Sequence, residues 1–149
     1  MRIAAAEKTW VVNIMNFYIN SPSYYSQIHG IDDEIYKMCR LLEKDIDIKK
    51  YTSLLDTVGI TPIIAPSLEI DCGNYAEVKY ISLPCRMASI SLHIDYSEYI
   101  SVSIEEKKAL IIKNILNSLL VIKKRLKNGF DYVQIENDIL TLVKATQDI

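Results

Sequence analysis

Glycine, proline, histidine and cysteine are all scarce in this chain of 149 residues. The four glycines stand apart from one another, so there is no glycine-rich loop of the GxGxxG or P-loop kind to cradle a nucleotide phosphate. The sequence also contains no HExxH, CxxC or GxSxG motif, the patterns of zinc proteases, of thiol or metal sites and of serine hydrolases. These absences argue against the commonest nucleotide-dependent and hydrolytic chemistries.

The three cysteines, Cys39, Cys72 and Cys85, are too few and too scattered for a disulfide framework. Their odd number favours free thiols in a reducing compartment. A structural zinc site would have to recruit these cysteines and a histidine from distant parts of the chain. We therefore expect no metal and no other cofactor.

Long apolar runs and an excess of basic charge are missing as well. No stretch approaches the roughly 18 apolar residues of a membrane-spanning helix. At the N-terminus, the charged residues Glu7 and Lys8 come before any apolar run long enough for an export signal. We expect a cytoplasmic protein with no membrane partner. The net charge of −2 disfavours direct nucleic-acid binding, although the cluster Lys123–Lys127 leaves a nucleic-acid-binding regulator as an alternative.

What the sequence does contain is a strand pattern that leads directly into a helix pattern, over Ser89–Lys127. Its first half alternates apolar and polar residues, and its second half carries a broad apolar stripe at helical spacing. Ser103, followed three residues later by Glu106, predicts the capped start of the helix. Gly129 is suited to the left-handed position just after its end.

Asp131 is placed to cap a final helix, which we expect to fold back on the long helix as an αα-hairpin. Upstream strands are expected over Val58–Ala65 and Glu77–Leu83, and the second of these forms a hairpin with Met87–Tyr96. Pro62 moves the first strand toward an edge or a strand start, because proline donates no ladder hydrogen bond.

Two helices are expected earlier in the chain. An acidic first turn at Asp32–Glu34 opens a helix with apolar residues at helical spacing through Ile46. The spacing over Trp10–Ile19 also favours a helix, although its β-branched and aromatic residues suit a buried strand too. The predicted fold is α+β, with one domain over residues 1–149. A small antiparallel sheet of about three to four strands packs against helices, and the chain ends in a long-helix αα-hairpin.

Candidate partner contacts are acidic residues and tyrosines outside the predicted core. A negative surface steers a basic protein partner, and rigid aromatic side chains anchor protein interfaces. For the acidic residues the alternative is a solvated surface or a helix N-terminus. The candidates are Tyr24, Tyr25, Asp32, Asp33, Glu69, Asp71, Tyr75, His93, Glu98 and Tyr99.

His93, Asp95 and Cys85 are the only combination that resembles a nucleophile with a base. Residues two apart on a strand share a face for purely structural reasons, so we favour a sheet-face or partner-binding role for His93. A small hydrolase or transferase that uses His93 and Asp95 stays open as an alternative. We assign no catalytic residue and do not expect an enzyme.

The C-terminal two thirds of the chain contains several short segments that are characteristic of a known family. The most specific are HIDYSEY at His93–Tyr99, GFDY at Gly129–Tyr132 and ENDI at Glu136–Ile139. With the strands VGITPIIAP and EVKYISL, they resemble an immunity-protein family of bacterial polymorphic-toxin and contact-dependent growth-inhibition systems. The resemblance extends over Val58–Ile139.

The resemblance implies a small cytosolic protein that binds the C-terminal toxin domain of an incoming effector and blocks it without chemistry of its own. Such toxins are often nucleases with basic clefts, so the implied partner is a basic nuclease domain bound 1:1 over its active site. A homodimer is compatible with the sequence. The motif residues Asp95, Tyr96, Phe130 and Asp131 lie at a strand end and a helix cap, where we expect them to determine the fold rather than contact the toxin.

Overall fold

The computed structural model describes residues 17–19, 33–66 and 77–147. The elements in chain order are β1 (Phe17–Ile19), α3 (Asp33–Asp45), the 3₁₀ helix η1 (Ile48–Lys50), β2 (Thr57–Ile60), β3 (Ile63–Ala65), β4 (Val78–Ser82), β5 (Met87–Ser91), β6 (His93–Asp95), α5 (Tyr96–Ile100), α6 (Ile104–Leu126), the 3₁₀ helix η2 (Lys127–Gly129) and α7 (Tyr132–Gln147). None of the helices described is long and apolar enough to cross a membrane.

The strands form a mixed sheet in the order β1-β2-β5-β4 and a second pair, β3-β6. The predicted hairpin is present, since β4 and β5 pair antiparallel. The prediction of antiparallel pairing throughout was wrong, because β1-β2, β2-β5 and β3-β6 are parallel. Parallel neighbours need a crossover connection, and α3 provides it between β1 and β2.

The predicted strand Val58–Ala65 is divided at Thr61 and Pro62 into β2 and β3. The partner strand is interrupted beside it at Leu92, between β5 and β6. Backbone pairing continues past both interruptions: the N–H of Thr61 donates to the carbonyl of Ile90 at 3.0 Å, and that of Ile63 to Leu92 at 2.9 Å. Pro62 therefore falls at a break in the ladder, directly before β3, which agrees with the predicted strand start. The strand β2 itself lies inside the sheet, between β1 and β5.

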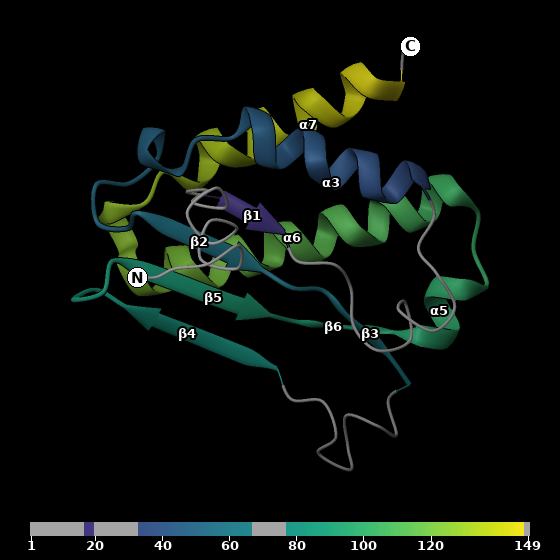
Figure 1. Ribbon diagram of the computed structural model, residues 1–149, viewed down its shortest axis with the longest axis horizontal. Helices are drawn as coiled ribbons and strands as arrows, with labels where there is room; N and C mark the ends of the chain where they lie inside the picture. Colours follow the sequence, from purple (N-terminus) through teal and green to yellow (C-terminus); the bar gives the residue numbers. More distant parts are fainter. Residues whose placement is uncertain (1–16, 20–32, 67–76, 148–149) are drawn as a thin grey trace, which may run out of the picture.

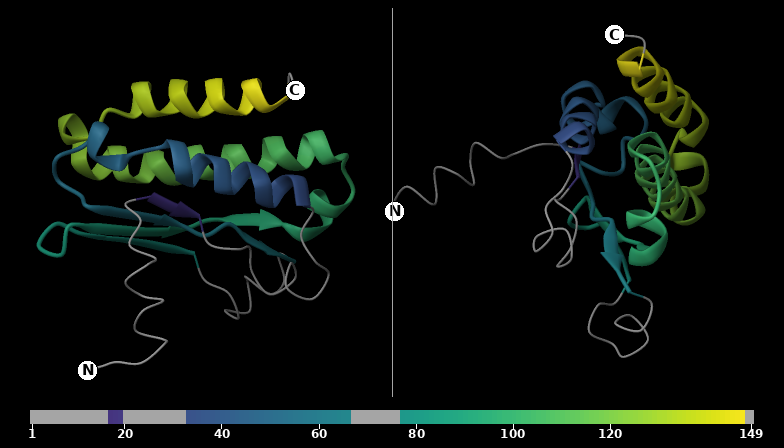
Figure 2. Two further views of the ribbon diagram at one scale, coloured as in Figure 1. Left: turned by 45° about the horizontal axis from the view of Figure 1, so that its top comes forward. Right: turned by 90° about the vertical axis from the view of Figure 1, so that its right-hand side faces the viewer.

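The helices stack in two layers on one face of the sheet (Figure 2). α3 and α6 pack against the strands, and α7 lies farther out, on α3 and α6. α6 buries Ile111, Ile115, Leu119 and Ile122 completely, and it contacts the sheet, α3 and α7. The predicted α+β class, the wide apolar face of the long helix and the C-terminal αα-hairpin are confirmed.

The helix expected over Trp10–Ile19 is wrong at its end, because Phe17–Ile19 form β1; residues 10–16 lie outside the described residues. Phe17 and Ile19 are buried, which agrees with the alternative interpretation as a buried strand. The outer edge of β1 is covered by α3. The buried carboxylate of Glu43 accepts the Ile19 N–H, and the Arg40 guanidinium donates to the Ile19 carbonyl at 2.9 Å.

The start of α6 is as predicted, and its end is not. The Ser103 hydroxyl accepts a hydrogen bond from the Glu106 N–H and donates one to the Glu106 carboxylate. At the other end, Lys127 and not Gly129 takes the positive φ, 53°. Gly129 instead allows a close approach, since a Cβ there would lie 2.5 Å from Cδ1 of Leu54.

Candidate functional site

Four of the ten predicted partner contacts lie in the described part of the chain: Asp33, His93, Glu98 and Tyr99. The other six, Tyr24, Tyr25, Asp32, Glu69, Asp71 and Tyr75, lie outside the described residues. Asp33 is exposed in the first turn of α3. Tyr99 was expected outside the core, but it lies in the helix α5, where only 8% of it is exposed.

His93 and Glu98 come together in an open hollow of about 260 Å³. Glu77 and Asp95 add two further carboxylates to its lining, and Lys113 is the one lysine there. We call this hollow the acidic pocket; its lining is Glu77, Leu92, His93, Ile94, Asp95, Glu98, Leu110, Lys113, Asn114 and Asn117. The strand β6, the short helix α5 and one side of α6 therefore build a concave, negatively charged surface.

Backbone hydrogen bonds hold two of these carboxylates in place. Asp95 is the N-cap of α5, and its carboxylate accepts from the Glu98 N–H at 3.2 Å and from the Ser97 hydroxyl. The Glu77 carboxylate accepts the His93 N–H at 2.8 Å. The Glu98 side chain is exposed, and its carboxylate accepts no such hydrogen bond within the described part of the chain, so it is the carboxylate best placed to reach a partner.

The His93 ring takes part in the pairing of β3 with β6. Its Nε2 lies 2.7 Å from the carbonyl oxygen of Ala65, an acceptor, so Nε2 carries the hydrogen of that bond. Cys85 lies in the exposed turn that joins β4 to β5, and the extended strand β5 separates it from His93 by about 20 Å. The structure thus does not bring Cys85 to His93 and Asp95.

Asn114 lies under the acidic pocket and is 5% exposed. Its Nδ2 donates to the Leu92 carbonyl at 2.8 Å, at the interruption between β5 and β6. Its Oδ1 is buried without a hydrogen-bond partner among the described residues. Sequence reasoning missed Asn114, although a polar residue inside the apolar stripe of Ile111, Ile115 and Leu119 was a visible signal. It missed Glu77 too, which directly precedes β4 and so lies beside the end of β5.

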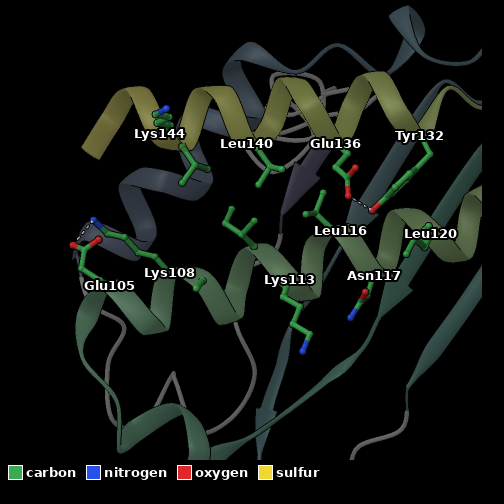
Figure 3. Close-up of a pocket in the computed structure, with 13 residues that line it drawn as sticks. Glu105, Lys108, Lys113, Leu116, Asn117, Leu120, Tyr132, Glu136, Leu140 and Lys144 are labelled. Atoms are coloured by element: carbon green, nitrogen blue, oxygen red, sulfur yellow. Dashed lines mark hydrogen bonds and ion pairs between the residues drawn. The ribbon is translucent and has the colours of Figure 1, made fainter. Parts of the chain in front are cut away.

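A larger groove, of about 670 Å³, runs between α6 and α7 (Figure 3). We call it the helical groove; it is lined by Glu105, Lys108, Ala109, Ile112, Lys113, Leu116, Asn117, Leu120, Tyr132, Glu136, Leu140, Val143 and Lys144. Leu116 and Leu140 point into the space between the two helices, while Lys113 and Asn117 point away from α7. These last two also line the acidic pocket, so they form a ridge of α6 between the two hollows.

Charged groups at the two ends of the helical groove have different partners. At one end, the Lys108 amine lies 3.3 Å from a Glu34 oxygen and 3.6 Å from a Glu105 oxygen. At the other, the Tyr132 hydroxyl donates to the Glu136 carboxylate at 3.1 Å. Burial, and then this hydrogen bond, raise the pKa of Tyr132 to about 12. The tyrosine is therefore a neutral donor at physiological pH.

No group of three or more histidine, cysteine, aspartate or glutamate side chains in residues 17–19, 33–66 and 77–147 could hold a metal ion. Cys39 is buried within α3, and burial raises the pKa of its thiol to about 11. A thiol in that state is a poor nucleophile and a poor metal ligand.

Comparison with protein families identifies the family of the chain. A family model described as "Immunity protein 44" matches residues 15–145. The chain belongs to the immunity protein 44 family. The match runs from β1 through most of α7 and so includes both hollows. It confirms the resemblance to an immunity-protein family seen in the sequence, and membership of the immunity protein 44 family supports an immunity function. No curated protein and no solved structure matches the chain.

Proposed function

We propose that this immunity protein 44 family member binds a cognate bacterial toxin domain 1:1 through the acidic pocket and its surroundings, and thereby neutralises the toxin without chemistry of its own. The observation that carries the proposal is the family match over residues 15–145. The gathering of Glu77, Asp95 and Glu98 at one hollow supports the choice of surface.

The chemistry of the acidic pocket favours a partner that brings a cationic side chain. Three carboxylates face a single lysine, Lys113. Lysine and arginine are donors only, and an arginine fork is the side chain that best bridges several acceptors. The toxin surface that docks here is therefore basic.

A basic surface that must be covered is typical of enzymes that hold nucleic-acid phosphates. We extend the proposal to a toxin with nuclease activity, delivered by contact-dependent inhibition and blocked by coverage of its active site. Charge complementarity of this kind raises the association rate and excludes wrong partners. The protein would act in the cytoplasm, where the toxin reaches nucleic acid.

Coexpression with the toxin domain encoded next to this chain's gene tests the proposal. We expect the wild-type chain to restore growth, and the purified proteins to form a 1:1 complex that abolishes cleavage of RNA or DNA. Glu98→Lys should weaken binding about tenfold or more, because it places like charge at the rim of the pocket. Asp45→Lys makes the same change of charge at the exposed C-terminal end of α3 and should leave affinity unchanged.

Equal killing with and without the wild-type chain, together with no complex in gel filtration, would refute the immunity function for the toxin tested. Full protection by both variants with equal affinities would keep the immunity function and refute the acidic pocket as the interface. A complex that forms while cleavage continues would refute coverage of the active site.

A further inference from the structure

We propose that the helical groove is a self-association surface, in which α7 of a second copy lies antiparallel against α7 across a twofold axis at Leu140. Leu140 lines the groove and remains 47% exposed. Val133, seven residues earlier, is 75% exposed. Residues seven apart lie on nearly the same side of a helix, so this side of α7 presents two exposed apolar side chains, of which Leu140 lies in the groove.

The charges on either side of Leu140 identify the occupant. Glu136 lies one turn before Leu140 and Lys144 one turn after it, and all three line the groove in a row along α7 (Figure 3). When two identical helices cross antiparallel at Leu140, residues equally distant from the crossing point meet. Each Glu136 then faces Lys144 of the other copy, twice per dimer. An isologous twofold interface requires this self-complementarity.

The wall formed by α6 supports the same orientation. α6 and α7 run antiparallel, so the N-terminal end of α6, with Lys108, lies beside the Lys144 end of α7 (Figure 3). A second α7 antiparallel to the first brings its Glu136 to this end, where two lysine amines face it. The carboxylates that pair with Lys108 at this end belong to Glu105 and Glu34. Lys144 forms no ion pair within the described part of the chain, which leaves it available to the second copy.

The size of the surface suits a dimer of ordinary strength. α7 has 16 residues and is therefore about 24 Å long. Two such helices that pack on each other and on both copies of α6 form a four-helix layer. This layer is of the kind that buries the roughly 1,200–2,000 Å² of a stable interface. The acidic pocket lies across the Lys113–Asn117 ridge, so each copy keeps that pocket for a toxin domain.

Light scattering with size exclusion on the full chain tests the dimer. The wild-type protein should show twice the monomer mass of 17.1 kDa at tens of micromolar. Leu140→Asp should return it to a monomer. Thr141→Asp places the same charge on the adjacent residue, which is exposed and does not line the groove, and should leave the dimer intact.

Charge exchange gives the decisive result. Glu136→Lys alone and Lys144→Glu alone each oppose like charges across the axis, so each should weaken the dimer about tenfold or more. Mixing the two single variants should form a heterodimer, because every opposed pair is then one lysine and one glutamate. The double variant should dimerise by itself for the same reason. The Lys144 side chain is exposed, so the Lys144→Glu variant should fold normally. It therefore tests the interface even if the Glu136→Lys variant fails to fold.

A wild-type chain that stays monomeric at about 200 µM would overturn the proposal. So would single variants that lose the dimer while their mixture fails to recover it. If the wild-type chain is monomeric and Leu140→Asp loses toxin binding, the groove belongs to the toxin interface, and the proposal is refuted while the immunity function stands. Loss of the dimer with toxin binding intact in Leu140→Asp supports two separate surfaces.

Discussion

Tyr51 and Asp138 are 87 residues apart in the sequence, yet the Tyr51 hydroxyl donates a hydrogen bond to the Asp138 carboxylate at 2.6 Å. The Asp131 N–H also donates to the Tyr51 carbonyl, at 2.8 Å. These two bonds attach the segment after η1 to the start of α7. The hydrogen bond from Tyr51, then those from Gln134 and the nearby Lys50, hold the pKa of Asp138 below its ordinary value of 3.8.

A lowered pKa makes this contact sensitive to acid. The stabilisation by Asp138 is complete above pH 3.8 and is lost as the pH falls through the lower pKa of the folded state. Tyr51→Phe should therefore lower the free energy of unfolding by about 1 kcal/mol near neutral pH, and by progressively less below pH 3.8. Urea unfolding over this pH range measures the difference. In an Asp138→Asn background the effect of Tyr51→Phe should not vary with pH; if it still does, another group is responsible.

At the scale of one element, the end of α6 depends on a residue in an unfavourable backbone conformation. Lys127 has φ 53° and ψ −114°, and its N–H still donates to the carbonyl of Lys123. The Lys123 amine closes the end by donating to the carbonyls of Lys127 and Phe130, at 2.8 and 3.1 Å. A residue with a Cβ is strained at this φ, so the geometry of the turn into α7 is imposed by the packing of the two helices.

Two glycine substitutions in this helix should have opposite effects. Lys127→Gly removes the steric cost of a positive φ and should raise the free energy of unfolding by about 0.5–1 kcal/mol. Lys124→Gly removes the same charge three residues earlier, inside the helix, and should lower it by about 1 kcal/mol. Urea unfolding of both variants measures the two changes in the free energy of unfolding. If both substitutions destabilise equally, the conformation of Lys127 is not a source of strain.

For the whole molecule, the placement of charge matters more than its total. The net charge is only −2, but Glu77, Asp95 and Glu98 gather at one hollow. That hollow lies near β6 and α5, at the opposite end of the sheet from the C-terminal end of α3 (Figure 1). A field concentrated in this way acts on approach to a partner, before contacts form.

This placement predicts how binding depends on salt. The association rate constant with the cognate toxin should fall at least tenfold as sodium chloride is raised from about 50 to about 500 mM, because the ions screen the attraction. The dissociation rate constant should change much less. Glu98→Lys should reduce the salt dependence of association, and Asp45→Lys should not. Surface plasmon resonance gives both constants; an association rate that does not respond to salt would contradict steering by this surface.

Local features of the fold were predictable wherever neighbouring residues decide them. The cap at Ser103, the hairpin before Met87 and the cap at Asp131, which accepts the Gln134 N–H at 3.2 Å, all follow from side chains within a few positions of one another. The strand β1 was not predictable in this way. A strand of three residues is too short to show a hydrophobic period in the sequence. It forms because β2 pairs with it and α3 covers its outer edge.

The sequence by itself determined the α+β class, the long core helix with its returning partner and the family, because spacing, caps and specific segments are local properties. Only the tertiary structure decided the parallel pairing of β2 with β1 and β5, since pairing partners are chosen by contacts between distant segments. The tertiary structure also decided which residues come together at the two candidate sites. Glu77 and Asn114 join His93 at one pocket, Cys85 is carried away from it, and the groove between α6 and α7 exists only because the two helices pack side by side.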